Sequence, residues 1–359
     1  MKQSLSENNL EELLTGNESV INANLYFVKV MIDEIKKIKT NGSFIFGSSN
    51  IFSPFSNTKI VYISYKFDLY SVYRRSKLRD YLMKNYSKEA CILEDSILDI
   101  SFEREKLETF LVYHRPLIIV NKGFNYKNVD FLKYAKEKGC KIVYDKYDTD
   151  YEDEEIQKVA DLCIASSKEI FNNELQYAKL KIEIPNGCDV KEINCKEKYS
   201  RKTAVYTGAN SNKIDFKMLD KIARKNKDWD VKIFTYDGYK YKDKYKHLIF
   251  EEPLEQEQLA EELSKCHLGL NLIEYNENTK GQLSDKFFNY CNARIPTLIY
   301  KEFEDNYKEF SPCYKIFKKY DLDKYTENND EVYNKILGQC DWSNRFDLLF
   351  KHLKEFNYF

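Results

Sequence analysis

The stretch "LSDKFFNYCNARIPTLIY", residues 283–300, decides the fold because a helix in it runs straight into an apolar strand. The predicted helix has one apolar face, because helical spacing places Phe287, Phe288, Cys291 and Ala293 on the same side. Arg294 ends this helix, and Pro296 prevents its continuation because proline has no amide hydrogen to donate. "PTLIY" is a short β-rich run of the kind that parallel sheets bury on both faces. The stretch therefore predicts a helix–strand unit of a parallel α/β sheet.

The same alternation extends outward from this unit through most of the chain. Strand-like and helix-like segments alternate from "KIVYISY" (59–65) to "LCIASS" (162–167), and the series restarts after the turn "IPNGCD" (184–189). This alternation is typical of βαβ units in parallel, doubly wound sheets. Since 359 residues exceed the roughly 250–300 at which a single core stops growing, we expect two domains with a cleft between them.

The pattern divides the chain into four segments. They are an N-terminal extension (1–57), a first Rossmann-like domain (58–187), a second Rossmann-like domain (188–335) and a C-terminal packing helix (336–359). Within the extension, residues 20–38 predict an amphipathic helix that packs on the protein or on a partner. A peripheral membrane contact or a contact between copies of the chain through residues 1–57 is the alternative.

Composition excludes several classes of protein. The 57 basic and 58 acidic residues give a net charge of −1, which argues against a nucleic-acid-binding surface over the whole protein. The nine cysteines include no C-x-x-C pair and no set at zinc spacing, so they indicate reduced, buried thiols. No apolar run reaches the roughly 18–20 residues of a membrane span, and the start lacks a signal-peptide pattern. We expect a soluble, cytoplasmic protein.

Two stretches resemble a known family. "YTGANSNKIDFKMLDKIARKNKDWDVKIFTYDG" (206–238) resembles the start of the donor domain in GT-B-fold glycosyltransferases, especially the retaining family 4. "LSDKFFNYCNARIPTLIY" is similar to that family's pattern of Ser, Lys, Glu-Tyr and Pro. The resemblance covers about residues 58–357 and depends on the order of several motifs. It implies a GT-B fold, in which two Rossmann-like domains face each other across a cleft, here with an N-terminal helical extension.

The helix that starts near Ser284 in the opening stretch is the predicted centre of the donor site. A helix start presents free amide groups and the positive end of the dipole, and Ser284 and Lys286 would add a hydroxyl and an ammonium group for a diphosphate. The structural alternative is that Ser284 only caps the helix and that Lys286 is solvated. Asn289 stands where the family usually has a Glu that holds the ribose hydroxyls, and an Asn both donates and accepts hydrogen bonds.

Other donor-side residues follow the first strands of the second series. Gly208 would let the backbone approach a ligand closely, and Lys213 would supply a second positive charge to the diphosphate. Tyr236 is predicted to belong to the same donor site. Asp215 is interpreted as the N-cap of the following helix rather than as a ligand group.

On the acceptor side the resemblance points to Asp148. "VYDKYD" closes the predicted fourth strand where many relatives have Tyr-Asp-x-x-Asp, which implies that Asp148 touches the acceptor hydroxyl. The alternative is that Asp148 and Asp150 form a metal-binding D-x-D motif. Arg74 would reach a phosphate or an acidic acceptor, or else belongs to a solvated basic face. His114 and His267 are interpreted as structural histidines.

Together these residues predict a hexosyltransferase that moves a sugar from a nucleotide diphosphate sugar to a hydroxyl of a glycan, lipid-linked or protein acceptor. Lys286 and Asp148 would carry catalysis, without a metal or another cofactor. The resemblance suggests bacterial surface polysaccharide biosynthesis or protein glycosylation, with retention of configuration. The alternatives are a catalytically degenerate partner subunit and a sugar-nucleotide epimerase of the same fold.

Overall fold

The structure is a computed structural model, and part of the chain is described below. The described residues are 58–64, 74–99, 101–147, 153–189, 197–208, 214–236, 238–254, 256–277, 279–327 and 330–358. The N-terminal extension and three residues of the predicted sites, Asp148, Asp150 and Lys213, lie outside these ranges. The predictions made for them therefore stay predictions.

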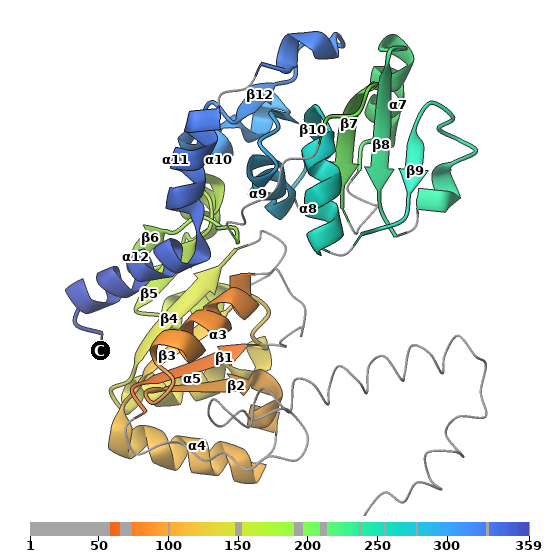
Figure 1. Cartoon of the computed structure of the whole chain (residues 1–359). Helices are drawn as coiled ribbons and strands as arrows, with labels where there is room; N and C mark the ends of the chain where they lie inside the picture. Colours follow the sequence, from red (N-terminus) through yellow and green to blue (C-terminus); the bar gives the residue numbers. More distant parts are fainter. Residues whose placement is uncertain are drawn as a thin grey trace, which may run out of the picture. The chain divides into compact units, whose positions relative to one another are not determined.

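The first domain is built on a six-stranded parallel sheet with the order β2-β1-β3-β4-β5-β6 (Figure 1). Its strands are β1 (Ile60–Ser64), β2 (Ala90–Glu94), β3 (Leu117–Asn121), β4 (Lys141–Lys146), β5 (Leu162–Ala165) and β6 (Lys181–Glu183). Its helices are α3 (Arg74–Asn85), α4 (Ser101–His114), α5 (Val129–Glu137) and α6 (Glu154–Val159), with shorter turns η1 (Asp95–Asp99), η2 (Tyr126–Asn128) and η3 (Ile170–Glu174). Every residue of β1 and β3 is buried, and both strands are mainly apolar. This pattern is expected for inner strands of a parallel sheet that is covered on both faces.

The second domain is built on a second parallel sheet, with the order β12-β11-β10-β7-β8-β9. Its strands are β7 (Lys202–Thr207), β8 (Trp229–Phe234), β9 (Ile249–Glu251), β10 (Leu268–Asn271), β11 (Thr297–Ile299) and β12 (Tyr314–Ile316). Its helices are α7 (Phe216–Lys225), α8 (Gln256–Lys265), α9 (Asp285–Asn292), α10 (Glu304–Tyr307) and α11 (Asp330–Cys340), with turns η5 (Gly238–Tyr241), η6 (Lys301–Phe303), η7 (Lys308–Phe310) and η8 (Leu322–Tyr325). Asp215 caps α7, since its Oδ1 accepts a hydrogen bond from the Met218 amide at 3.0 Å, as predicted.

Each sheet has one point at which the strand order reverses. In the first sheet this point lies between β1 and β3, and in the second it lies between β7 and β10. Ligands of open α/β sheets bind outside the carboxyl ends of the strands at such points. The carboxyl ends of these four strands are therefore the two places at which the fold favours a binding site.

Helix α9 packs on the second sheet as the opening stretch predicts. Phe287, Phe288 and Cys291 are buried in the core that includes β7 and β10. The ring of Tyr290 lies so close to Gly269 of β10 that an added Cβ there would come within 2.5 Å of it. Glycine at 269 therefore lets α9 approach the sheet, which places the start of the helix next to the carboxyl end of β10.

The last helix, α12 (Trp342–Glu355), belongs to the core of the first sheet. It contributes an apolar stripe of Trp342, Phe346, Leu349, Phe350 and Leu353 to the cluster that contains Ile60 and Tyr62 of β1. The two segments that connect the domains lie side by side: where the chain leaves the first domain, the Cys188 amide donates to the Cys340 carbonyl, where the chain returns to it, at 2.8 Å. Gly187 is required there, since a Cβ would lie 2.6 Å from that carbonyl oxygen.

The α/β class and the two doubly wound sheets of the sequence prediction are confirmed. The boundaries at 57/58, 187/188 and 335/336 stay predictions. Among the described residues, no helix combines the length and the apolar character that crossing a membrane requires.

Candidate functional site

Lys286 lies at the switch point of the second sheet. It is the second residue of α9, and its Nζ donates a hydrogen bond to Tyr206 Oη at 3.1 Å. The same ammonium group lies 4.7 Å from the centre of the Tyr206 ring. Tyr206 belongs to β7, two residues before Gly208. The structure thus brings Lys286 to the carboxyl end of β7, and the solvated alternative for this lysine is wrong.

The ammonium group of Lys286 is partly buried against the phenol of Tyr206. Among the residues that the structure describes, Lys286 forms no ion pair, and the hydrogen bond that it makes is to a neutral phenol. Burial lowers the pKa of Lys286 to about 8, and the neighbouring Asp285 raises it only in part. Burial also raises the pKa of Tyr206, so its hydroxyl remains protonated. A desolvated cation of this kind gains free energy when an anion arrives.

Ser284 occupies the N-cap position of α9 but does not cap the helix with its side chain. Its backbone is extended, with φ −75° and ψ 131°, and its hydroxyl makes no cap hydrogen bond. Instead, its amide donates to Tyr307 Oη at 3.0 Å, and Tyr307 also accepts a hydrogen bond from the Asn271 amide group at the end of β10. The capping alternative for Ser284 is therefore wrong, and its hydroxyl is not used by the helix backbone.

Three further residues of the predicted donor site, Gly208, Asn289 and Tyr236, belong to the described part of the chain. A Cβ at Gly208 would lie 3.0 Å from a carbon of the Tyr206 ring, so glycine lets the backbone pass close to this tyrosine. Asn289 is one turn after Lys286 on α9 and is partly exposed. Tyr236, just after β8, is 69% exposed. Their contacts with a donor stay predictions.

Sequence reasoning missed Tyr206 and Tyr290, which fix α9 against β7. The Tyr290 hydroxyl accepts a hydrogen bond from the Thr207 amide at 3.0 Å and donates to the Leu270 carbonyl at 3.3 Å. It therefore joins the ends of β7 and β10 across the switch point. The only signal in the sequence was the position of a tyrosine two residues before Gly208 and of another inside the apolar helix.

The first sheet presents a different arrangement at its carboxyl edge. Arg74, the first residue of α3, is 2% exposed, and its Nε donates to both carboxylate oxygens of Asp145 at 2.9 and 2.8 Å. Its Nη1 donates to the Ile184 carbonyl at 2.6 Å, while its Nη2 is buried and has no hydrogen-bond partner in the part of the chain that the structure describes. The solvated-face alternative is therefore wrong for Arg74, because its charge is neutralised inside the protein. Contact with an acceptor stays a prediction.

The switch point of the first sheet carries neutral polar side chains and one buried lysine, Lys122, whose Nζ lies 5.8 Å from the centre of the Tyr147 ring. Asn121, at the end of β3, donates hydrogen bonds to Tyr62 Oη at 2.7 Å and to Ser64 Oγ at 3.1 Å. Asn121 Oδ1 is buried and has no hydrogen-bond partner among the described residues. At the end of β4, the buried Lys146 is paired with Asp153 at 2.9 Å. Sequence reasoning assigned none of these residues, because it treated the strands as apolar core.

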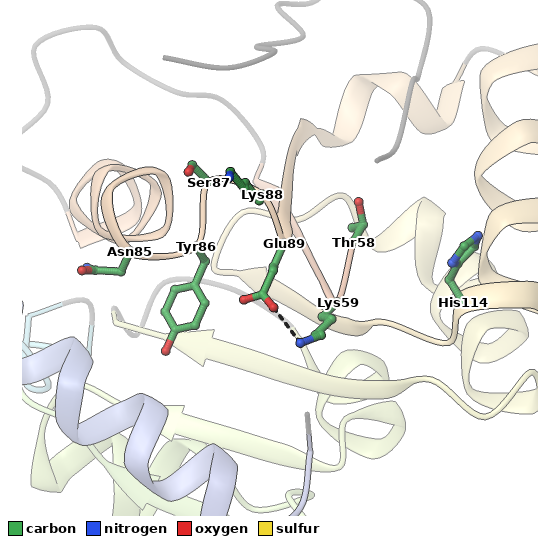
Figure 2. Close-up of a pocket in the computed structure, with 8 residues that line it drawn as sticks. All are labelled: Thr58, Lys59, Asn85, Tyr86, Ser87, Lys88, Glu89 and His114. Carbon is green, nitrogen blue, oxygen red and sulfur yellow. Dashed lines mark hydrogen bonds and ion pairs between the residues drawn. The ribbon is translucent and has the colours of Figure 1, made fainter. Parts of the chain in front are cut away.

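A pocket of about 710 Å³ lies at the opposite, amino-terminal edge of the first sheet (Figure 2). It is lined by Thr58, Lys59, Asn85, Tyr86, Ser87, Lys88, Glu89 and His114. Lys59 pairs with Glu89 at 2.6 Å, and His114 ends α4 and stacks on Phe110 with ring centroids 4.4 Å apart. His114 is thus a helix-end histidine, as predicted. Because this pocket lies away from the carboxyl edge, we give it no part in the candidate site.

His267 also has a structural position. It immediately precedes β10, at the amino-terminal end of that strand, and its Nδ1 accepts a hydrogen bond from the Thr203 amide at 3.1 Å. Burial lowers the pKa of His267, so the neutral ring that accepts this bond is favoured. The interpretation of His267 as a structural histidine is confirmed.

Comparisons with known proteins agree with this architecture. No family model and no curated protein matches the sequence. Solved structures do match: HepE from Anabaena in complex with UDP and glucose is 10% identical, with 83% of this chain and 100% of that chain covered and a TM-score of 0.57. A UDP-forming trehalose-phosphate synthase from Burkholderia xenovorans, in complex with glucose-6-phosphate, is also 10% identical, with 82% and 100% covered and a TM-score of 0.54.

A third structure, apo OtsA, is 9% identical, with 83% of this chain and 99% of that chain covered and a TM-score of 0.55. Sequence identities this low support a conclusion about the fold and none about the activity. Together with the two parallel six-stranded sheets, they show that the chain has the GT-B fold.

Proposed function

We propose that the protein is a glycosyltransferase whose second domain binds a nucleotide diphosphate sugar and whose first domain presents an acceptor hydroxyl. The observation that carries this proposal is Lys286, a partly buried cation at a helix start beside the switch point of the second sheet, held against the phenol of Tyr206. The GT-B fold supports it, since the similar structures include proteins solved with UDP and with a sugar or a sugar phosphate.

Lys286 would stabilise the leaving group. As the bond between the sugar and the diphosphate breaks, negative charge develops on the phosphate oxygens, and a preorganised cation stabilises that charge most in the transition state. The phenol of Tyr206 holds the ammonium group in place without neutralising it, because it is a hydrogen-bond acceptor and a π surface rather than a counter-ion. A bound diphosphate would favour the protonated form of Lys286.

The remaining donor contacts complete this proposal. The start of α9 near Ser284 and the backbone at Gly208 would add hydrogen-bond donors, Lys213 would add a second positive charge, and Asn289 would bind the ribose. On the other side, Asp148 would accept the proton of the acceptor hydroxyl. We further propose that no metal is needed and that the reaction takes place in the cytoplasm on a glycan, lipid-linked or protein acceptor.

A thermal-shift screen of nucleotides and nucleotide sugars tests the proposal. A ligand present at 100 times its dissociation constant should raise the free energy of unfolding by about 2.7 kcal/mol. Hits should be nucleoside diphosphates and their sugar conjugates, and the matching nucleosides should have weaker effects. If no nucleotide or nucleotide sugar raises the unfolding temperature at millimolar concentration, the proposal is wrong.

Asn289 favours a second candidate, a partner subunit that binds without turnover. The family's Glu is replaced there by a neutral side chain, which makes weaker hydrogen bonds to the ribose hydroxyls. Slow hydrolysis of the bound nucleotide sugar in the absence of an acceptor would favour the enzyme. Tight binding of the donor with no hydrolysis and no transfer to any acceptor in a broad panel would favour the partner subunit.

A further inference from the structure

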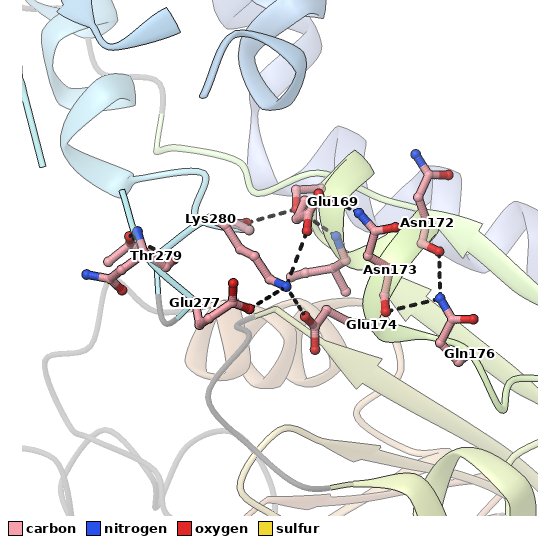
Figure 3. Close-up of polar contacts among 12 residues, drawn as sticks. Glu169, Asn172, Asn173, Glu174, Gln176, Glu277, Thr279 and Lys280 are labelled. Atoms are coloured by element: carbon pink, nitrogen blue, oxygen red, sulfur yellow. Dashed lines mark hydrogen bonds and ion pairs between the residues drawn. The ribbon is translucent and has the colours of Figure 1, made fainter. Parts of the chain in front are cut away.

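Lys280 joins the segment between β10 and α9 to the first domain. Its Nζ lies 3.3 Å from a carboxylate oxygen of Glu174 and 3.6 Å from one of Glu169, and both glutamates follow β5 (Figure 3). Its third partner, Glu277 at 2.9 Å, lies on its own segment and is 89% exposed. The side chain of Lys280 is only 20% exposed, so these ion pairs are screened less than those of a fully exposed lysine.

The backbone of the same segment is held by side chains from outside it. Asn306 of α10 donates to the Lys280 carbonyl at 2.7 Å, and Ser167 of the first domain donates to the Gly281 carbonyl at 2.8 Å. Asn186, in the turn between the domains, donates to the Leu283 carbonyl at 3.2 Å. Three carbonyl groups within four residues are therefore fixed immediately before α9 begins.

This segment leads directly into the residue on which the proposed function depends. Lys286 is six residues after Lys280, and its position beside Tyr206 requires that α9 start at the right place. The hydrogen bonds to the Gly281 and Leu283 carbonyls fix the backbone of this segment. The ion pairs of Lys280 with Glu169 and Glu174 attach the same segment to the first domain. A displacement of about 1 Å at a reacting group can reduce a rate by roughly two orders of magnitude.

We propose that Lys280 is a positioning residue for the donor site: by pairing with Glu169 and Glu174 it couples the first domain to the start of α9 and so sets the place of Lys286. This inference rests on the proposed function for what is positioned, but the coupling itself belongs to contacts that are independent of any ligand. The pair with Glu174 should matter and the shorter pair with Glu277 should not, because Glu277 moves with the segment.

Transfer kinetics test the proposal with matched variants. Lys280→Ala and Glu174→Gln should each lower kcat about fivefold to tenfold, whereas Lys280→Arg should retain most of it and Glu277→Gln should change it less than twofold. Lys324→Ala, which removes a lysine paired with Asp321 within the second domain, controls for loss of charge. A merely structural role would instead lower the yield of folded protein in Lys280→Ala and Glu174→Gln and leave kcat per folded molecule unchanged.

The pH profile of diphosphate binding gives a readout specific to Lys286. If Lys280→Ala lets Lys286 move toward water, the pH at which diphosphate affinity falls should rise by about one unit relative to the wild type. Affinity for the nucleoside, which lacks phosphates, should stay within about twofold. An unchanged profile in Lys280→Ala and in Glu174→Gln would overturn the positioning role.

Hydrogen exchange separates failure of this inference from failure of the proposed function, because it needs no ligand. In the free protein, amides of residues 284–288 should exchange at least about fivefold faster in Lys280→Ala and Glu174→Gln, with no change in α12. The Glu277→Gln and Lys324→Ala proteins should match the wild type. Equal exchange in all five proteins would refute the coupling, whether or not the protein binds a nucleotide.

Discussion

The carboxyl edges of the two sheets hold their cations differently. At the first sheet, Arg74 and Lys146 are both buried and both paired with carboxylates, Asp145 and Asp153, while Lys122 lies against the Tyr147 ring. At the second sheet, the ammonium group of Lys286 meets a phenol. A cation already neutralised inside the protein has little attraction left for a ligand, whereas a partly buried cation that forms no ion pair with the described residues favours an arriving anion. This difference is why we assign the diphosphate to the second sheet and a neutral hydroxyl acceptor to the first.

The largest effect is expected from breaking the ion pair of the first sheet. Asp145→Ala would leave the Arg74 guanidinium buried without its counter-ion, which typically costs about 3–5 kcal/mol of the free energy of unfolding. Urea denaturation would measure this loss. As a control, Lys77→Ala removes a partly exposed ion pair with Asp189 and should cost no more than about 1 kcal/mol. Equal losses in the two variants would mean that Arg74 is not held as the structure has it.

Removing Lys286 from the second sheet should lower the rate of sugar transfer without destabilising the protein. Lys286→Ala is expected to lower sugar transfer by about 10² to 10³ fold, the scale seen when one stabiliser of developing charge is removed. Its free energy of unfolding at pH 7 should not fall below that of the wild type, since the lysine forms no ion pair in the described residues and its lowered pKa means that its charge is less stable in the folded chain than in the unfolded one. Steady-state transfer assays and denaturation of the same preparation would check both statements. Full activity in this variant would show that the donor site lies elsewhere.

The sequence predicts the strands that contain an apolar run and misses β6 and β12, for a physical reason. Central strands such as β1 are mostly apolar because both faces are buried. The missed strands β6 and β12 have three residues each, lie at sheet edges and are partly exposed. Each carries a lysine and β6 also carries a glutamate, so neither leaves an apolar run. Short edge strands are recognised by their pairing partners, which only the folded chain supplies.

The residues of the candidate site also divide into those that the sequence indicates and those that it does not. Lys286, Ser284 and Gly208 were predicted to belong to the site because a helix start and a glycine turn have local signatures. Tyr206 and Asp145 were missed because each lies in a buried strand, where a tyrosine is expected as core and where the partner of a charge depends on tertiary contacts. Asp145 did leave one signal: it is a carboxylate that directly follows the apolar run "IVY" in the strand "KIVYDK", and a buried charge requires a partner.

The pH dependence of diphosphate binding sharpens the contrast between the sheets. Since the folded-state pKa of Lys286 is lowered to about 8 by burial, the lysine is charged below pH 8 and loses its proton above it. Affinity for a nucleoside diphosphate should therefore be constant from pH 7 to near 8 and then fall, by up to tenfold per pH unit. Titration calorimetry over pH 7–9.5 would measure this fall.

Lys286→Arg provides the control for this pH dependence, because arginine stays charged over the whole range. Its affinity for the diphosphate should not fall between pH 8 and 9.5. The free protein offers a further check with the opposite sign. The unfolded state binds the Lys286 proton more tightly than the folded state, so its contribution to stability should rise between about pH 8 and 10.5. A fall in affinity that is the same in both proteins would exclude Lys286 as its source.

The smallest effect is expected at Asn289. If its amide holds the ribose, Asn289→Ala should weaken nucleotide binding by the value of one or two neutral hydrogen bonds, about 0.5–1.5 kcal/mol each. Isothermal titration with the nucleotide found in the screen would measure it, and the deoxyribose analogue should bind the wild type and the variant equally well. Unchanged affinity for the ribonucleotide would mean that position 289 no longer belongs to the donor site.

The most direct test of the account compares a nucleoside diphosphate with its nucleoside in the wild type and in Lys286→Ala. A charge-assisted hydrogen bond is worth about 1.5–3 kcal/mol, so the mutation should reduce the diphosphate's advantage over the nucleoside by at least tenfold while nucleoside affinity stays within about twofold. Four dissociation constants measured at pH 7 are sufficient. If the diphosphate keeps its full advantage in a folded Lys286→Ala protein, the cation of the second sheet is not a diphosphate site and the central claim is wrong.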